Sequence, residues 1–271
     1  MRKSNTVFIA AFTAVVVLFG IYFLVQLGKN KNANPALVVP EEPLTVSVKD
    51  GDDVLLAGVI ANDPEDGDLS GEVIVEGLSS FGDDMSRTVT YAVCDKNGNV
   101  SKKTRQLFYS DYVPPRFSMD GQIIISAWND RTVMRHLTAC DGAEGDISGR
   151  ITIGENVQVD SYTGLYTAVA EVRTQSGIVE KVTVAVLVAP PVSRILPTVT
   201  LDTYLLYVDL GGVFDPYSHV ESVVYNSGNG TGTVTAIGEA DTSTAGDYLI
   251  EYTAESSDGN IGRAYLTVCV R

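Results

Sequence analysis

One stretch of this 271-residue chain occurs twice, 78 residues apart. The first copy runs from Ala61 to Val75 and the second from Ala139 to Ile153. Ala, Asp, Gly, Asp, Ser and Gly recur at matched positions, and Leu69, Val73 and Val75 become Ile147, Ile151 and Ile153. Self-similarity at a fixed period is the signature of repeated structural units. A chain of this length has room for one large domain or for two to three small ones.

Around each copy, the chain alternates apolar and polar residues in short runs, which predicts half-buried strands. Asp66-Gly67 supplies a residue that tolerates positive φ between two strands. Turn residues separate the runs, and no helical periodicity is evident, so a β-sandwich is favoured. The strands expected in the two repeats are residues 44–48, 54–60, 88–93 and 104–109, then 122–125, 165–172 and 181–188.

A third unit keeps only part of the pattern. Its second half has expected strands at 244–252 and 264–268 around an Asp258-Gly-Asn260 turn, but the Asp-Gly-Asp turn is missing. We expect a different hairpin at Asn226–Gly232 in its place. Pro114-Pro115 and Pro190-Pro191 predict semi-rigid joints, so the three units are expected to form a rod.

The acidic Asp-Gly-Asp turn, together with the segment from Tyr91 to Asn99, resembles the immunoglobulin-like repeat of bacterial surface proteins, which also occurs in pesticidal crystal proteins and Gram-positive surface proteins. The resemblance covers residues 44–268. It implies an extracytoplasmic sandwich that serves as a stalk, spacer or adhesion module, and it implies no shared activity.

The N-terminus carries an apolar run from Val7 to Leu27. As a helix it would span about 31 Å, which matches the hydrocarbon core of a bilayer. A cleavable signal peptide is the alternative, but Leu27-Gly-Lys-Asn-Lys lacks a small-x-small cleavage site. Arg2, Lys3 and the terminal amine favour the N-terminus inside.

The predicted fold is therefore all-β, with three tandem immunoglobulin-like β-sandwiches preceded by one N-terminal transmembrane α-helix. The predicted location is the cell membrane, with a single pass and the C-terminal domains outside. The predicted segments are a cytoplasmic tip (1–6), the transmembrane helix (7–27), a juxtamembrane linker (28–42) and three domains (43–113, 114–190 and 191–271).

The charge of the chain argues against nucleic acid as a partner. The first 31 residues hold four basic residues and no acid, whereas the rest hold 15 basic and 34 acidic residues. So acidic a surface repels phosphate backbones and keeps an exposed domain soluble.

Acidic side chains cluster in both copies of the repeated stretch and could supply oxygen ligands for calcium. The spacing is not that of an EF-hand loop, and a tight Asp-Gly turn with capping side chains gives the same sequence. We therefore expect structural turns and no cofactor, with calcium as the alternative. The residues are Asp63, Glu65, Asp66 and Asp68, then Asp141, Glu144 and Asp146.

The three cysteines, Cys94, Cys140 and Cys269, fall one in each predicted domain, so no disulfide is expected within a domain. Burial in the cores is the expected role, and an intermolecular bridge through Cys269 is the alternative. The two histidines, His136 and His219, are expected at strand edges. A serine-type nucleophile needs a base and an orienting group converging on it, so no catalytic residues and no enzyme are predicted.

Aromatic residues leave one binding role open. Trp128 and the tyrosines could form a platform for carbohydrate stacking. Four tyrosines fall instead at core-strand positions and are expected to pack: Tyr91, Tyr166, Tyr248 and Tyr252. Lys49 and Asn99 are available for the Lys–Asn cross-link of some related surface domains, although their spacing does not single them out.

These observations predict a non-enzymatic cell-surface module that binds a partner or holds one away from the membrane. The expected partners are the lipid bilayer, through the N-terminal helix, and an extracellular protein or glycan. A structural subunit of an envelope or appendage assembly and a carbohydrate-binding accessory module are the alternatives.

Overall fold

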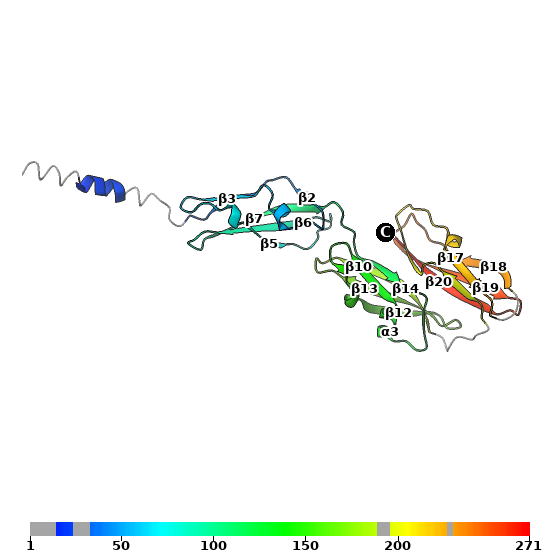
Figure 1. The fold of residues 1–271 in the computed structure, drawn as a ribbon. Coiled ribbons are helices and arrows are strands. Elements are labelled where there is room, and N and C mark those ends of the chain that lie inside the picture. Colours follow the sequence, from blue (N-terminus) through cyan, green and yellow to red (C-terminus); the bar gives the residue numbers. More distant parts are fainter. Residues whose placement is uncertain (1–14, 24–32, 189–195, 227–229) are drawn as a thin grey trace, which may run out of the picture. The chain divides into compact units, whose positions relative to one another are not determined.

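The computed structural model describes residues 15–23, 33–188, 196–226 and 230–271, the last from the backbone alone at 230–232. The described chain forms two compact units (Figure 1). The first holds the residues up to Tyr109, and the second holds Ser110–Arg271 together with Ser47–Lys49.

Only part of the predicted N-terminal anchor falls in the described residues. Residues 15–23 are helical, whereas the remainder of the predicted 7–27 helix, the 1–6 tip and the start of the linker lie outside them. Among the described residues, no helix is both long enough and apolar enough to cross a membrane.

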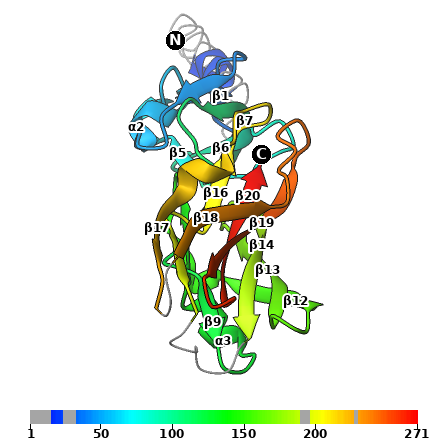
Figure 2. The same ribbon diagram turned by 90° about the vertical axis from the view of Figure 1, so that its right-hand side faces the viewer.

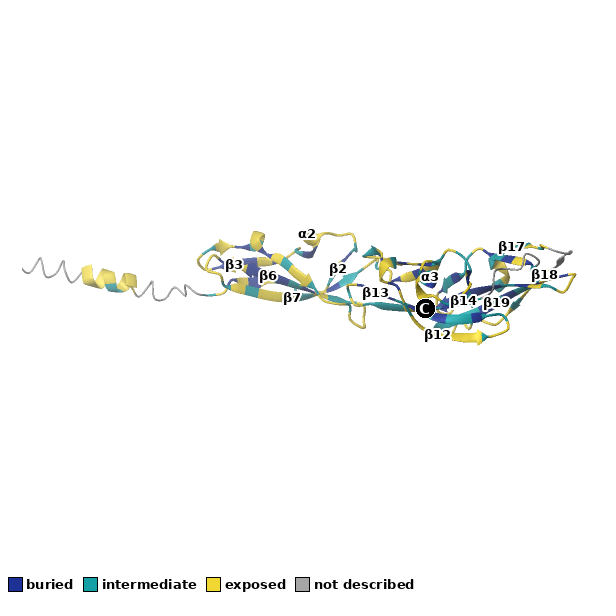
Figure 3. Cartoon of the chain, turned by 90° about the horizontal axis from the view of Figure 1, so that it is seen from below, coloured by how far each residue is buried: buried dark blue, intermediate teal, exposed yellow. Residues whose placement is uncertain are grey.

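The first unit is a sandwich of two sheets. Aromatic and aliphatic side chains from both sheets meet between them, with Tyr91 and Leu107 fully buried. Figure 3 shows buried stretches along strands of this sandwich in dark blue. All strand pairs are antiparallel except β2 with β7. One sheet has the order β1 (Ala36–Val38), β3 (Ile60–Asp63), β4 (Gly67–Asp68), and the other β2 (Leu44–Val46), β7 (Val100–Tyr109), β6 (Arg87–Cys94), β5 (Ile74–Leu78).

Two predictions for this unit were wrong. The expected strand at 54–60 is instead the short helix α2 (Asp52–Leu55) and a turn, with Leu55 buried. Asp52 and Asp53 occupy the first turn of α2, where carboxylates are favourable, and Gly58 has a φ of 77°, which ends regular structure. The expected linker contains β1, because Leu37 is buried and β1 pairs with β3.

The second unit begins with a sandwich that repeats the first element by element. From α2 to β7, each element of the first unit has a counterpart that begins 77 to 79 residues later, which confirms the repeat. One sheet has the order β11 (Gly145–Asp146), β10 (Leu137–Asp141), β8 (Arg116–Met119), and the other β12 (Thr152–Asp160), β13 (Leu165–Arg173), β14 (Val179–Val188), β9 (Ile123–Ile125). Helix α3 (Asp130–Met134) matches α2, and the 3₁₀ turns η1 (Ser70–Glu72) and η2 (Ser148–Arg150) match each other.

The third sandwich keeps this plan with a different front half. Its strands β16 to β20 are labelled in Figure 2. A 3₁₀ turn, η3 (Pro216–His219), precedes β17, and the buried Tyr252 hydroxyl donates to the Pro216 carbonyl at 2.8 Å. In the first unit, the Tyr91 hydroxyl donates to the Leu55 carbonyl across the same sequence separation and at the same distance. The sheets are β15 (Thr198–Leu201) with β17 (Val220–Val224), and β16 (Leu205–Val208), β20 (Ile261–Val270), β19 (Gly246–Ser256), β18 (Gly230–Ile237).

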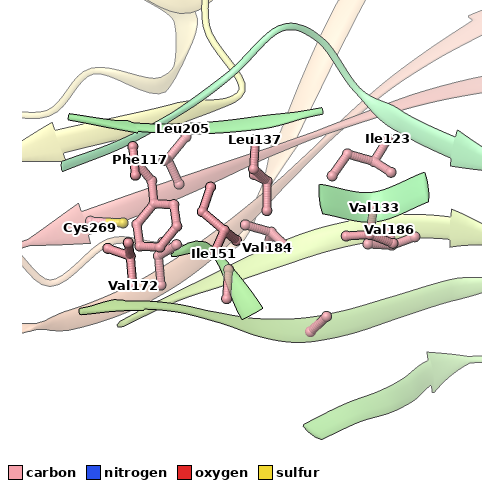
Figure 4. Close-up of a cluster of buried hydrophobic side chains, with 14 of the residues drawn as sticks. Phe117, Ile123, Val133, Leu137, Ile151, Val172, Val184, Val186, Leu205 and Cys269 are labelled. Atoms are coloured by element: carbon pink, nitrogen blue, oxygen red, sulfur yellow. The ribbon is translucent and has the colours of Figure 1, made fainter. Parts of the chain in front are cut away.

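The second and third sandwiches share buried residues. Leu205 and Cys269 of the third belong to the core that surrounds Phe117 and Val172 of the second (Figure 4). The Phe117 N–H donates to the Tyr207 hydroxyl at 3.0 Å. The Pro-rich joint predicted between these units gave no reason to expect that they share a core. The joint itself, at 189–195, lies outside the described residues, and the boundary between 114–190 and 191–271 stays a prediction.

Backbone groups of β14 explain why the third sandwich packs there. β9 pairs only with Val186–Val188, so the preceding part of β14 is an open strand edge. Side chains of the third sandwich cover it: the Arg271 guanidinium donates to the Lys181 carbonyl at 2.8 Å, and the Thr183 N–H donates to the Asp247 carboxylate at 2.6 Å. An edge strand that is left uncovered can pair with strands of other chains and cause aggregation.

An ion-pair network reinforces this contact. Arg271 lies 2.9 Å from an Asp247 oxygen and 3.1 Å from a Glu180 oxygen. Burial raises the pKa of Glu180, against the opposing effect of Arg271. We call Glu180, Lys181, Thr183, Asp247 and Arg271 the junction network.

The first unit has a different residue at the matching position of its own strand, β7. Arg105 is the sixth residue of β7, as the fully buried Val184 is of β14. The Arg105 side chain donates to the Glu42 carbonyl at 2.7 Å and to the Ala57 carbonyl at 3.4 Å. The two sandwiches thus differ at this position, where the first has an arginine that bonds within its own unit and the second has a buried valine.

Candidate functional site

The first carboxylate of each acidic turn is used by the backbone. Asp63 Oδ1 accepts hydrogen bonds from the N–H groups of Glu65 at 2.8 Å and Asp66 at 3.0 Å. Asp141 Oδ1 accepts from the two residues at the matched positions, both at 2.9 Å. These are Asx turns, which the side chain of an aspartate stabilises locally.

The last carboxylate of each turn is also a structural acceptor. Asp68 and Asp146 each accept from the backbone N–H and the hydroxyl of the serine two residues later, Ser70 and Ser148. These hydrogen bonds, the hydroxyl bond foremost, lower the pKa of both aspartates. Gly67 has a φ of 78° and Gly145 a φ of 73°, which confirms the predicted positive-φ turn.

The middle acids tie the turn to the hairpin beside it. Asp66 accepts from the Lys96 backbone N–H at 2.9 Å and from its ammonium at 3.0 Å. Glu144 accepts from the Gln175 N–H at 2.7 Å and pairs with Arg150. Within the described residues, no group of three or more His, Cys, Asp or Glu side chains is arranged to hold a metal ion. The hydrogen bonds of these carboxylates stabilise the turns and hold them to the neighbouring hairpins.

Both histidines pair with an aspartate. His136 Nδ1 lies 2.9 Å from an Asp120 oxygen, and His219 Nδ1 lies 3.1 Å from an Asp202 oxygen. His219 also stacks on Phe214, with 5.8 Å between ring centroids. The two pairs occupy matched places in the second and third sandwiches, which indicates a role in the fold.

The cysteines differ from the prediction of three buried side chains. Cys269 is fully buried, and burial raises the pKa of its thiol. Cys94 and Cys140 are exposed, because each lies on the outer side of its strand. All three are free thiols.

Trp128 is a packing residue rather than an open platform. It is half-buried against the core of the second sandwich, its indole N–H donates to Asp130 at 2.7 Å, and its ring lies 5.6 Å from that of Tyr166. Tyr91 and Tyr252 are fully buried, and Tyr166 and Tyr248 are partly buried against their cores. The expectation that these four tyrosines pack is confirmed.

The amide of Asn99 also has a structural use, since it donates to Asp95 at 2.7 Å. The structure thus gives Asn99 a role in the hairpin turn after β6. Lys49 is exposed.

A surface groove that the sequence did not reveal lies on the second unit, between the second and third sandwiches. It consists of two adjoining hollows of about 720 and 580 Å³, which share Tyr162, Thr163, Ile261 and Arg263. Hollows of this size are in the range that accommodates small ligands. Tyr162, in the turn between β12 and β13, is 90% exposed. We call these hollows the inter-sandwich groove.

One wall of the groove is the outer face of a sheet. Strand register sets Thr235 beside Thr253 and Thr253 beside Arg263 in one row across β18, β19 and β20. Arg263 pairs with Glu251 at 2.9 Å. The alternation of the expected strands predicts which of these residues face outward. It does not predict that another sandwich lies next to this face of the sheet.

Comparisons with known proteins add the following. No family model and no curated protein matches this chain. Among solved structures, it is similar to the M60 catalytic domain with the CBM51-1 and CBM51-2 domains of Clostridium perfringens ZmpB, with 13% identity and a TM-score of 0.24 over 88% of this chain and 31% of that one. A structure of CBM51-2 in complex with GlcNAc and INT domains from the same protein gives 17% identity and a TM-score of 0.23 over 88% of this chain and 42% of that one.

Mouse cadherin-23 EC22–24 is also similar, with 13% identity and a TM-score of 0.18 over 89% of this chain and 99% of that one. This chain thus spans less than half the length of the two ZmpB structures. At these identities and TM-scores, the likenesses say nothing of function.

Proposed function

We propose that this chain is a non-enzymatic, membrane-anchored module of a bacterial cell surface, whose immunoglobulin-like sandwiches bind a partner or hold one away from the bilayer. The single observation that supports this most is the use of the acidic turns: in both copies the carboxylates are committed to backbone and side-chain hydrogen bonds that stabilise the fold. The resemblance to bacterial surface repeats supports the same role.

The contact between the second and third sandwiches also supports a mechanical or presenting role. The junction network holds the two sheets together, so a force applied to one sandwich acts on the other as well. Residues 7–27 provide the anchor in this proposal, and the excess of acids in residues 32–271, with 15 basic and 34 acidic residues, keeps the remainder in solvent.

Protease accessibility on intact cells tests the location. A tagged C-terminus should be removed by external protease while the first residues stay protected. A C-terminus that is digested only after lysis would refute the proposed orientation, and release of the chain into the medium would refute the anchor.

A structural subunit of an assembly is the second candidate, and an exposed edge strand favours it. β12 forms the edge of its sheet, and Val157 and Val159 are 58% and 55% exposed (Figure 3). Register shifts at both ends of the paired segment work against edge pairing, since irregular edges pair poorly. Sedimentation velocity at rising concentration tests this candidate: the subunit role requires oligomers that V157K weakens, and a constant monomer would exclude it.

A further inference from the structure

The inter-sandwich groove is built on a fixed frame. Its walls belong to the second and third sandwiches, and Leu165 and Ala185 of the second bury the Tyr265 ring of the third beside it. Tyr265 is 3% exposed, and burial raises its pKa to about 12. Together with the junction network, this contact sets the groove in place before any ligand arrives, which lowers the cost of binding.

The groove presents one large open ring among many hydroxyl and amide groups. Tyr162 is the most exposed tyrosine among the described residues, and it lines both hollows. Threonines line the groove from both sandwiches, Arg263 lines both hollows and Asn260 lines the larger one. The threonines are Thr163, Thr198, Thr200, Thr233, Thr235 and Thr253.

One donor in the groove has no partner. Gln122 lines the larger hollow, and its side-chain nitrogen is buried without a hydrogen bond. A buried amide donor without an acceptor costs free energy, so the Gln122 amide gains a hydrogen bond if its side chain turns toward a ligand oxygen in the hollow. Ile124 and Ile261 provide apolar surface on the same side.

Charge narrows the class of ligand. Among the described residues, Arg263 is the one cation that lines the two hollows, and it is already paired with Glu251 at 2.9 Å. Asp160 and Glu255 add negative charge to the smaller hollow. An anionic ligand would therefore meet repulsion, whereas an uncharged one would not.

We propose that the inter-sandwich groove binds a neutral oligosaccharide, with a sugar ring stacked on Tyr162 and its hydroxyls bonded to the threonines, Arg263 and Gln122. Sugars offer an apolar C–H face and a fan of hydroxyls, which matches an open tyrosine above polar side chains. An extended peptide matches less well, because it seeks the N–H and C=O groups of a strand edge and this wall is the face of a sheet. The inference deepens the proposed binding role and rests on it.

The test is binding of the purified full-length chain, in detergent, to an array of neutral, acidic and amino-sugar oligosaccharides, followed by titration calorimetry with the best neutral ligand. The variant is Tyr162→Ala, and the control is Tyr217→Ala, since Tyr217 is 56% exposed but lies outside the groove. We expect binding to neutral oligosaccharides, a loss of affinity of about tenfold or more in Tyr162→Ala, and no change in the control.

Several outcomes would overturn the inference. One is that the wild type binds no neutral glycan, and another is that Tyr162→Ala binds with the same affinity as the wild type. A preference for acidic glycans, or for basic peptides on a parallel peptide array, would also contradict it. The protease-accessibility experiment separates the two proposals, because a chain that is exposed on cells but binds no glycan would refute only the glycan-binding proposal. A chain that binds glycan but is found inside the cell would sink the proposed location instead.

Discussion

Replacing Arg271 with alanine should destabilise the second sandwich, although Arg271 belongs to the third. Its guanidinium pairs with Asp247 and Glu180 and donates to the Lys181 carbonyl. The Glu180 and Asp247 side chains are only 17% and 15% exposed, so both carboxylates would be left largely desolvated without a cation. Because Arg271 itself is one-third exposed, we expect a loss of about 2–3 kcal/mol rather than the full cost of a buried pair.

Trp128 provides the assay. It is the only tryptophan of the chain, and it packs against the core of the second sandwich, so its fluorescence reports the unfolding of that sandwich in urea. In R271A the midpoint of the Trp128 transition should fall by about 1 M.

R173A is the matched control. Arg173 lies on β13 of the same sandwich, is 64% exposed and contacts Glu171 only at 3.9 Å, so its loss should change stability by less than about 0.5 kcal/mol. An R271A midpoint equal to that of the wild type would show that the two sandwiches are energetically independent, and the reasoning about the junction would be refuted.

Three further predictions concern pH, thiols and metal. Because the pKa of Asp146 is lowered in the folded chain, its contribution is present above the ordinary value of 3.8 and is lost as pH falls through the folded value; D146N should be less stable than the wild type at pH 7, with the difference in urea midpoint vanishing in acid. A thiol reagent should label Cys94 and Cys140 quickly and Cys269 only after unfolding, so intact mass spectrometry of the native chain should show two adducts, and three would contradict the burial of Cys269. Chelation with EDTA should leave the melting temperature unchanged, and a drop reversed by calcium would show that the acidic turns hold the ion.

Much of the fold could be predicted from the sequence because the repeat carries its own local chemistry. Asp63, Gly67 and Ser70 each have a backbone task within the turn, so the same residues had to reappear at Asp141, Gly145 and Ser148. Alternation also identified the strands around Tyr91 and Tyr252. These are short-range signals, and they survive without knowledge of the tertiary structure.

The errors come from residues whose role is decided at a distance. The apolar run from Val54 to Ile60 predicts a strand, but Leu55 is the one apolar side chain of α2 that faces the core. The sequence pattern does not predict β1, because the strand is short and only Leu37 is buried. Neither residue differs in type from its exposed neighbours.

The groove and the junction were beyond sequence reasoning for a similar reason. Arg271 and Asp247 read as ordinary surface charges, and only the incomplete pairing of β14 gives them a task. Tyr162 read as a turn residue, since its exposure depends on the fold around it.

The claim on which the account depends is that the second and third sandwiches form one body. Backbone ¹⁵N relaxation of the full-length chain tests it most directly, through the rotational diffusion of residues 116–188 and of residues 198–270. The account predicts one diffusion tensor for both segments, which R271A splits. Two independent tensors in the wild-type chain would contradict it, and the groove would then have no fixed walls.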